Sequence, residues 1–171
     1  MGNGWNPIVA VDPNGNEVEV VVWSPVGRYP IGATGYYAGS SGFGHVSVNV
    51  NGTSYSWGPK GMDIQSKYDY HLNQSTFRSG FGFSLKVSPA EEKRMLAILQ
   101  SYEGNTDYDI FLKNCTHPIQ DAMAEIGINL DWMFTPPNLK SSLVDNDLIY
   151  QSEYYPDEGS GYVTVGDLEI E

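Results

Sequence analysis

The chain has 171 residues, of which 40% are hydrophobic and 18% are charged, and its formal net charge is −12. This size and composition predict a single folded domain with one core. With only nine Lys and Arg residues, the chain lacks the basic face of a nucleic-acid-binding protein and is disfavoured at anionic membrane surfaces. Its acidity suits a basic protein partner or a cationic surface instead.

Targeting and cofactor signals are absent from the sequence. No apolar run is long enough to cross a bilayer, and the first ten residues have neither the basic start nor the apolar stretch of a signal peptide. We therefore expect no stable membrane insertion and no export by the general secretory route. The one cysteine, Cys115, excludes an internal disulfide and a multi-cysteine zinc site. We expect neither a metal nor another cofactor, because the histidines lack ligand spacing.

Turn and strand signals open the chain. Residues 12–15 (DPNG) predict a turn, and Val18, Val20 and Val22 then alternate with other residues as in a strand. Residues 25–44 are rich in Gly, Ser and Tyr, which predicts a loop with short strand pieces. Loops of this kind often line functional sites.

The clearest β-hairpin spans residues 45–59, where two alternating runs flank Asn51-Gly52, the strongest two-residue turn signal. Pairing across that turn divides the side chains between two faces. The face expected in the core carries Val46, Val48, Tyr55 and Trp57. The other face carries His45, Ser47, Asn49, Ser54 and Ser56. The hairpin therefore places a histidine among hydroxyls and an amide.

The sequence predicts mostly helices in the second half of the chain. Residues 60–80 look irregular, and residues 81–87 predict a short strand. A capping box at residues 88–91 (SPAE) opens a helix that ends at Gly104. A second helix starts near Cys115.

Further signals define the rest of that half. Pro118 fits the first turn of the second helix, and Gly127 caps its end. Residues 135–144 predict a short third helix. The acidic stretch from residue 151 predicts a mobile tail or an edge strand at 162–165.

The position of Cys115 favours nucleophilic chemistry. A helix N-terminus lowers the pKa of a thiol, and its unpaired N–H groups can stabilise the oxyanion formed when a carbonyl is attacked. Asn114 and Thr116 flank the thiol and are the candidates for oxyanion and orienting roles. A base must lie within hydrogen-bond reach of the sulfur.

His45 is the best candidate for that base. His117 lies two residues after the thiol on the same helix and should point away from it, and His71 falls in the irregular, exposed stretch. His45 starts a strand behind glycines that permit close backbone approach. Ser54, Ser56 and Asn49 are candidates to orient its ring, although serine is a weaker orienting group than a carboxylate or an amide. Tyr36, Tyr37 and Phe43 precede the base and are candidates to line the cleft.

Residues 44–144 resemble a known family in the order of their motifs. GHVSV at 44–48, a capped helix, YDIFLKNC at 108–115 and a helix ending in Gly127-Ile128 look like the circularly permuted NlpC-type, papain-like cysteine hydrolases. The lecithin:retinol acyltransferase group shares this layout. The resemblance implies an α+β, papain-like fold whose antiparallel sheet packs against the helix that carries the nucleophilic Cys115. It implies His45 as base and places the third polar residue at Ser56 or its neighbours.

A second resemblance concerns the N-terminal segment. Residues 6–18 (NPIVAVDPNGNEV) are similar to the stretch that closes the core of Rhs-repeat proteins, just before their variable C-terminal toxin domains. This implies a domain order of 1–24 as a remnant of the parent core, 25–150 as the catalytic domain and 151–171 as an acidic tail. It further implies a toxin delivered by type VI secretion and neutralised by an immunity protein.

Three function classes stay open at this stage. The first is a cysteine hydrolase cleaving an amide bond of a peptidoglycan stem peptide or cross-bridge, acting in the periplasm of a target cell. The second keeps the thiol chemistry as an acyltransferase, phospholipase, protease or deamidase with a cytoplasmic target. The third is a non-enzymatic interaction domain, in which Cys115 would be buried and unreactive.

Overall fold

The computed structural model describes most of the chain between residues 17 and 158. The described ranges are 17–26, 29–31, 36–38, 43–76, 78–109, 112–130, 135–144 and 146–158, with backbone alone for 29–31 and 36–38. The turn expected at 12–15 and the strand expected at 162–165 lie outside these ranges.

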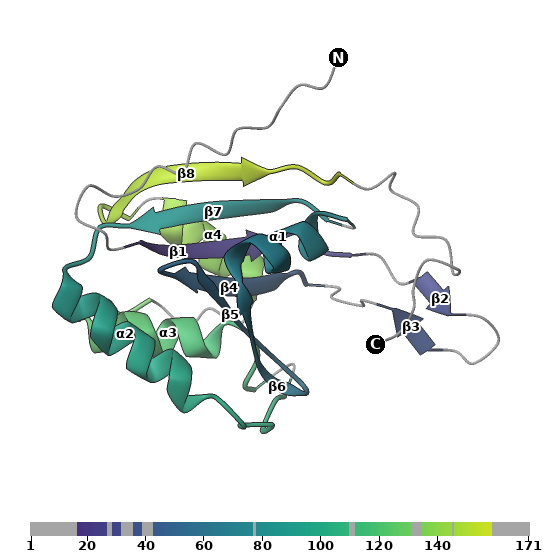
Figure 1. Ribbon diagram of the computed structural model, residues 1–171, viewed down its shortest axis with the longest axis horizontal. Helices are drawn as coiled ribbons and strands as arrows, with labels where there is room; N and C mark the ends of the chain where they lie inside the picture. Colours follow the sequence, from purple (N-terminus) through teal and green to yellow (C-terminus); the bar gives the residue numbers. More distant parts are fainter. Residues whose placement is uncertain are drawn as a thin grey trace, which may run out of the picture.

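Eight strands and four helices make up the described part. In chain order they are β1 Val18–Trp23, β2 Tyr29–Ile31, β3 Tyr36–Ala38, β4 His45–Val50, β5 Thr53–Gly58, β6 Gly61–Ser66, α1 Lys67–Ser75, β7 Gly80–Leu85, α2 Pro89–Ser101, α3 His117–Glu125, α4 Pro136–Val144 and β8 Ile149–Tyr155. Six strands form one sheet in the order β6-β5-β4-β1-β7-β8, with every neighbouring pair antiparallel (Figure 1). The expected α+β class with an antiparallel sheet is confirmed.

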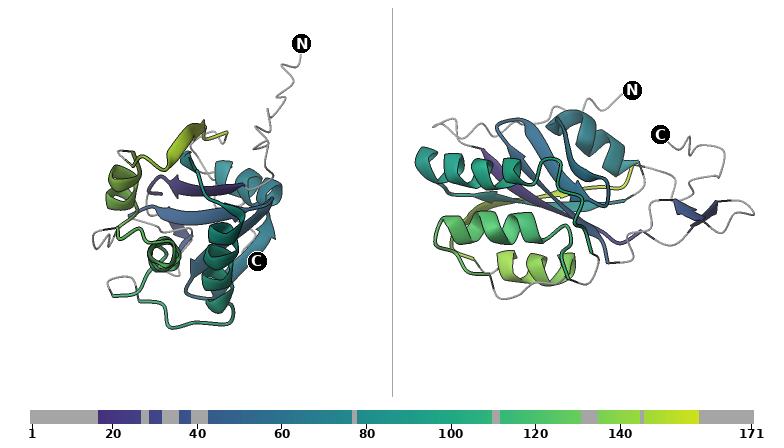
Figure 2. Two further views of the ribbon diagram at one scale, coloured as in Figure 1. Left: turned by 90° about the vertical axis from the view of Figure 1, so that its left-hand side faces the viewer. Right: turned by 90° about the horizontal axis from the view of Figure 1, so that it is seen from below.

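Helices cover both faces of this sheet. Val18, Val20 and Val22 of β1 face a core built with α2, α3 and α4. Val21 and Trp23 of the same strand pack with Tyr70 of α1 on the opposite face. Figure 2 shows α2, α3 and α4 running along the sheet. All six residues of β1 are buried as a result.

The predicted hairpin is confirmed as β4 and β5. Val50 pairs with Thr53 across the turn, and Asn51 and Gly52 have φ angles of 48° and 79°. Positive φ at both central residues is the requirement of the type I′ turn that joins twisted strands. The register places His45 on the same face of the sheet as Ser56, because alternate residues of a strand share a face.

The three predicted helices are also present. Ser88 and Glu91 form the expected capping box of α2, with both reciprocal hydrogen bonds made. Helix α3 begins at His117, with Thr116 as its N-cap and Pro118 in the first turn. Helix α4 covers nine residues of the expected third helix.

The expectation of irregular structure at residues 60–80 is wrong. This segment forms β6, which pairs with β5, and helix α1, which Ser66 caps by accepting from the N–H of Asp69. His71 is therefore not in an exposed irregular stretch. Its ring packs between the rings of Trp23 and Tyr155, with centroids 5.3 and 4.6 Å away.

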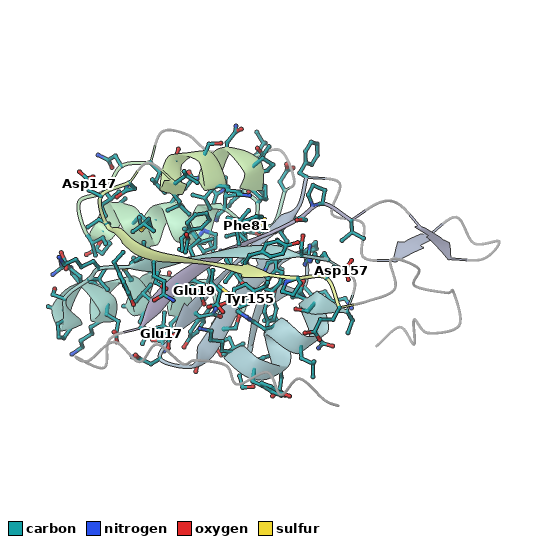
Figure 3. The ribbon with its side chains drawn as sticks, turned by 90° about the horizontal axis from the view of Figure 1, so that it is seen from above. Glu17, Glu19, Phe81, Asp147, Tyr155 and Asp157 are labelled. Atoms are coloured by element: carbon teal, nitrogen blue, oxygen red, sulfur yellow. The ribbon has the colours of Figure 1, made fainter. Side chains whose placement is uncertain are left out.

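A buried ionic network fastens α1 and β8 to the sheet. Glu19 is only 2% exposed and accepts hydrogen bonds from Tyr155 Oη at 2.6 Å and Asn49 Nδ2 at 2.8 Å. Lys67 Nζ lies 3.0 Å from the same carboxylate. Asn49 Nδ2 also lies 2.8 Å from His71 Nε2. Figure 3 shows Glu19 and Tyr155 close together in this part of the sheet. Together these contacts compensate the cost of burying a carboxylate.

Strand β8 is the edge of the sheet beside β7. Strand β1 lies before the domain boundary expected at 24/25, and β8 crosses the boundary expected at 150/151. The sheet therefore contains residues from outside the expected range 25–150. Among the helices of the described residues, none is long and apolar enough to cross a membrane.

Candidate active site

His45 stands at the first position of β4, where the chain enters the sheet through a glycine. Gly44 has φ of +88°, and a Cβ there would lie 2.5 Å from the carbonyl oxygen of Trp23. The expected close backbone approach before the histidine is thus present, and only glycine accommodates it. Pairing of Trp23 with His45 closes the ladder between β1 and β4 at this end.

The Cys115 thiol is buried where the ladder between β4 and β5 ends. The ladder of these two strands ends at Val48 and Tyr55, so Val46 has no partner on β5. The backbone N–H of Val46 instead hydrogen-bonds the sulfur of Cys115. Cys115 also belongs to the core cluster that Val46 and Val48 form with α2, α3 and α4. Its contact is with the residue next to His45.

Tyr108 approaches the thiol from the other side. Its hydroxyl hydrogen-bonds the sulfur of Cys115, and the backbone N–H of Cys115 hydrogen-bonds the Tyr108 oxygen. Burial raises the pKa of the Tyr108 phenol to about 12, so this hydroxyl stays a donor. The thiol therefore faces three hydrogen-bond donors, which are the N–H of Val46, its own backbone N–H and the Tyr108 hydroxyl.

A chain of hydrogen bonds supports the imidazole. His45 Nε2 lies 2.6 Å from Ser56 Oγ, and the Tyr70 hydroxyl donates to the same oxygen at 2.8 Å. Ser56 and Tyr70 are 6% and 3% exposed. Because Nε2 is engaged by Ser56, Nδ1 is the other ring nitrogen that could accept a proton. Ser54, the other serine considered, is buried without a side-chain hydrogen bond in the described part of the chain.

Arg78 contributes a buried positive charge. It is 8% exposed, donates to Gln74 Oε1 through Nε at 2.7 Å, and its guanidinium carbon lies 6.0 Å from the centroid of a Trp23 ring. Burial lowers its pKa to about 10, which still leaves it charged at neutral pH. That charge acts on His45, favouring the neutral ring, and on Cys115, favouring the thiolate.

Burial nevertheless dominates the protonation of the pair. It raises the pKa of the Cys115 thiol to about 11, although donors and Arg78 pull in the other direction. Burial, assisted by Arg78, lowers the pKa of His45 to about 3. The expectation of a lowered thiol pKa from the helix N-terminus is therefore reversed here. At neutral pH the site holds an uncharged thiol and an uncharged imidazole.

Asn114 and Thr116 shape the turn before α3. The side-chain oxygen of Asn114 accepts from the N–H of Thr116 at 3.0 Å and from its hydroxyl at 2.8 Å. His117 Nδ1 accepts from the N–H of Asn114 at 3.1 Å. His117 is thus tied to the backbone of this turn, and these bonds hold Cys115 at the end of the turn.

The three aromatic residues proposed for the cleft have different outcomes. Tyr36 and Tyr37 belong to β3, and their side chains lie outside the described part of the structure. Phe43 is half exposed, two residues before His45. An exposed ring beside the candidate base is compatible with the expected place in a cleft.

Three residues of the site were not among the sequence-based candidates. Tyr70 and Arg78 lie in the segment expected to be irregular. Tyr108 lies seven residues before Cys115, within the motif quoted for the family resemblance, and that position is the one signal that could have identified it.

Among the described residues, no group of three or more His, Cys, Asp and Glu side chains is placed to hold a metal ion.

The comparisons with known proteins do not assign the chain to a family. No protein-family model matches the chain, and neither the curated proteins nor the solved structures contain a significant match.

Proposed function

We propose that the protein is a cysteine hydrolase that cleaves an amide bond, with Cys115 as nucleophile and His45 as base. The observation that carries this proposal is the end of the ladder between β4 and β5, where Val46 has no partner on β5. There the thiol bonds the N–H of Val46, and the neighbouring His45 is held through Nε2 by Ser56. A nucleophile, a base and an orienting group are the parts that thiol hydrolysis needs.

The uncharged resting pair suits general-base catalysis rather than a preformed ion pair. The sulfur of Cys115 attacks the carbonyl carbon while its proton moves to His45 Nδ1. His45 then protonates the leaving amine as the C–N bond breaks, leaving a thioester. Water attacks the thioester, gives its proton to His45, and releases the carboxylic acid and the thiol. Tyr108 and the N–H of Val46 are the candidate donors to the developing negative charge.

The motif order favours the circularly permuted NlpC-type, papain-like fold and a peptide of peptidoglycan as substrate. An α+β architecture in which α3, just after Cys115, packs on the core face of an antiparallel sheet supports this assignment. With the Rhs-like residues 6–18, it favours an antibacterial effector of type VI secretion. Such an effector would act in the periplasm of a target cell and be held in check by a cognate immunity protein.

The test is release of muropeptides from purified peptidoglycan, followed by chromatography and mass spectrometry. Cys115→Ala should abolish release, and His45→Ala should lower the rate by about 10²- to 10⁴-fold, as removal of a general base does. His71→Gln is the matched control, because it replaces another histidine of the same sheet region, keeps an acceptor for Asn49, and leaves Cys115, His45 and Ser56 untouched. It should retain activity.

Toxicity in the periplasm gives an independent readout. The wild-type chain, expressed with an export signal, should lyse the host, and Cys115→Ala should not. A Cys115→Ala protein that still kills, or that still releases muropeptides, would show that the thiol is not the nucleophile. Toxicity confined to the cytoplasm would contradict the peptidoglycan substrate and leave a cytoplasmic amide or ester as the target.

A further inference from the structure

We infer that Tyr70 is a positioning residue of this site, acting through Ser56 to determine which nitrogen of His45 carries the proton. The inference rests on the proposed function, because it assigns a role within that reaction. It starts from the group that stands where a carboxylate or an amide would be expected. That group is a serine, and a serine hydroxyl can either donate to or accept from the imidazole.

The direction of that hydrogen bond decides whether His45 can act as a base. For Nδ1 to take the proton of the thiol, Nδ1 must be bare and Nε2 must carry the hydrogen. Ser56 must then accept from Nε2. If Ser56 donates to Nε2 instead, the ring proton sits on Nδ1, and that nitrogen cannot accept the proton of the thiol.

The Tyr70 hydroxyl offers Ser56 the alternative partner that it needs. Ser56 Oγ lies 2.6 Å from His45 Nε2 and 2.8 Å from the Tyr70 oxygen. In the arrangement with Tyr70 as donor, the Ser56 proton points to Nε2. Rotation of the Tyr70 and Ser56 hydroxyls lets Ser56 donate to Tyr70 and accept from Nε2. His45 then gains the base-competent form without movement of any heavy atom.

Removal of the Tyr70 hydroxyl takes this choice away. Ser56 is buried, so among the described side chains its proton would have Nε2 of His45 as the remaining partner, and a buried hydroxyl strongly prefers a bonded state. Tyr70→Phe should therefore hold His45 with the proton on Nδ1. The expected effect is a fall in kcat of about ten- to a hundredfold with KM unchanged, the factor that one buried hydrogen bond provides.

Tyr155→Phe is a closely matched control. Tyr155 also packs on Trp23, with ring centroids 6.1 Å apart against 6.2 Å for Tyr70. Its hydroxyl also donates one hydrogen bond to a buried acceptor, but that acceptor is Glu19. Both variants lose one phenolic hydroxyl from the same face of the sheet, and only one of them loses it from the chain that reaches His45.

The experiment is ¹⁵N nuclear magnetic resonance of the His45 ring in the wild type and both variants, with melting curves to verify folding. Tyr70→Phe should shift the ring toward the form protonated at Nδ1, and Tyr155→Phe should leave it unchanged. Equal spectra for the three proteins would overturn the inference. So would an identical shift in both variants, since that would mean a general loosening of this face.

Repeating Tyr70→Phe in a Ser56→Asp variant separates the effect of the Tyr70 hydroxyl on the His45 tautomer from an effect on packing. Aspartate in place of Ser56 only accepts, so it fixes the hydrogen on Nε2 whatever Tyr70 does. In Ser56→Asp, the further change Tyr70→Phe should leave the His45 tautomer and the rate of muropeptide release unchanged. A loss as large as in the Ser56 background would show that Tyr70 acts through packing, and would overturn the inference.

The two hypotheses can fail separately. The tautomer of His45 is measured without any substrate, so a shift confined to Tyr70→Phe supports the inference even if the wild type releases no muropeptide. In that case the proposed function fails. Conversely, full muropeptide release by Tyr70→Phe with an unshifted ring overturns the inference and leaves the hydrolase proposal in place.

Discussion

The neutral ring of His71 should make the fold sensitive to mild acid. His71 Nε2 accepts from Asn49 Nδ2 at 2.8 Å, which requires an unprotonated nitrogen. Burial lowers its pKa from 6.5 to about 4, although Glu19 works in the opposite direction. Below pH 6.5 the unfolded chain therefore binds a proton that the folded chain refuses, so the stability present above this pH is lost as the pH falls toward 4.

The size of the effect follows from the shift. At about 1.4 kcal/mol for each unit of pKa, His71 alone should remove about 3 kcal/mol between pH 7 and pH 4. His71→Gln keeps an acceptor for Asn49 and cannot be protonated. Urea unfolding at pH 7, 6 and 5, above the range where carboxylates titrate, should give a free energy of unfolding that falls less steeply in His71→Gln. The difference should be about 1 kcal/mol per pH unit between pH 6 and 5.

Leu72→Gln provides the control for this measurement. It adds the same side chain to α1 at a position that is about half exposed and outside the buried network. Its stability should depend on pH as the wild type's does. Parallel curves for wild type and His71→Gln would refute the reasoning, because they would mean that His71 is protonated to the same extent in the folded and unfolded chains.

Three further changes should alter stability through single, local causes, each measured as a shift in the urea midpoint. Gly82→Ala places a Cβ 2.0 Å from Glu19 Oε1, so it should lower the free energy of unfolding by about 3 kcal/mol by displacing a buried carboxylate. An unchanged urea midpoint would contradict the close packing of Glu19 against Gly82. Ser88→Ala removes the capping box with Glu91 and should cost about 1 kcal/mol, while Ser101→Ala near the other end of α2 should cost less. Gly52→Ala imposes a side chain at φ of +79° and should cost about 1 kcal/mol, whereas Gly52→Asn, which tolerates this region better, should cost less.

The elements that the sequence predicts well are those whose signals are local. The Asn51-Gly52 turn and the capping box from Ser88 to Glu91 each act within four residues. The alternation of valines in β1 is similarly direct. These signals were sufficient for the α+β class, for the hairpin that carries His45, and for the helix that follows Cys115.

The missed elements lack an apolar face with a regular period. Helix α1 presents Tyr70 and His71 to the sheet rather than leucines and valines, so apolar periodicity fails to reveal it. Glu19 lies between valines, and it is buried because α1 covers that face of β1. Strand β8 lies at the sheet edge and has no apolar alternation.

The same cause limits prediction of the site. Cys115 and His45 could be proposed from motif order and from their positions near a helix start and a strand start. The support around them could not, because Tyr70 and Arg78 reach the site only through the fold of a segment without apolar pattern. The direction in which the thiol pKa shifts could not be predicted either, since it depends on burial of Cys115 rather than on its place before helix α3.

The hydrogen bond from Tyr155 to Glu19 joins residues 136 positions apart in the sequence. This separation has a consequence for folding during synthesis on the ribosome. Strand β1 emerges first, with a carboxylate that needs donors from β4, α1 and β8. The last of these donors becomes available only after residue 155 has left the exit tunnel. The nascent domain should therefore stay incompletely folded, and dependent on chaperones, until its final described strand is free to add to the sheet.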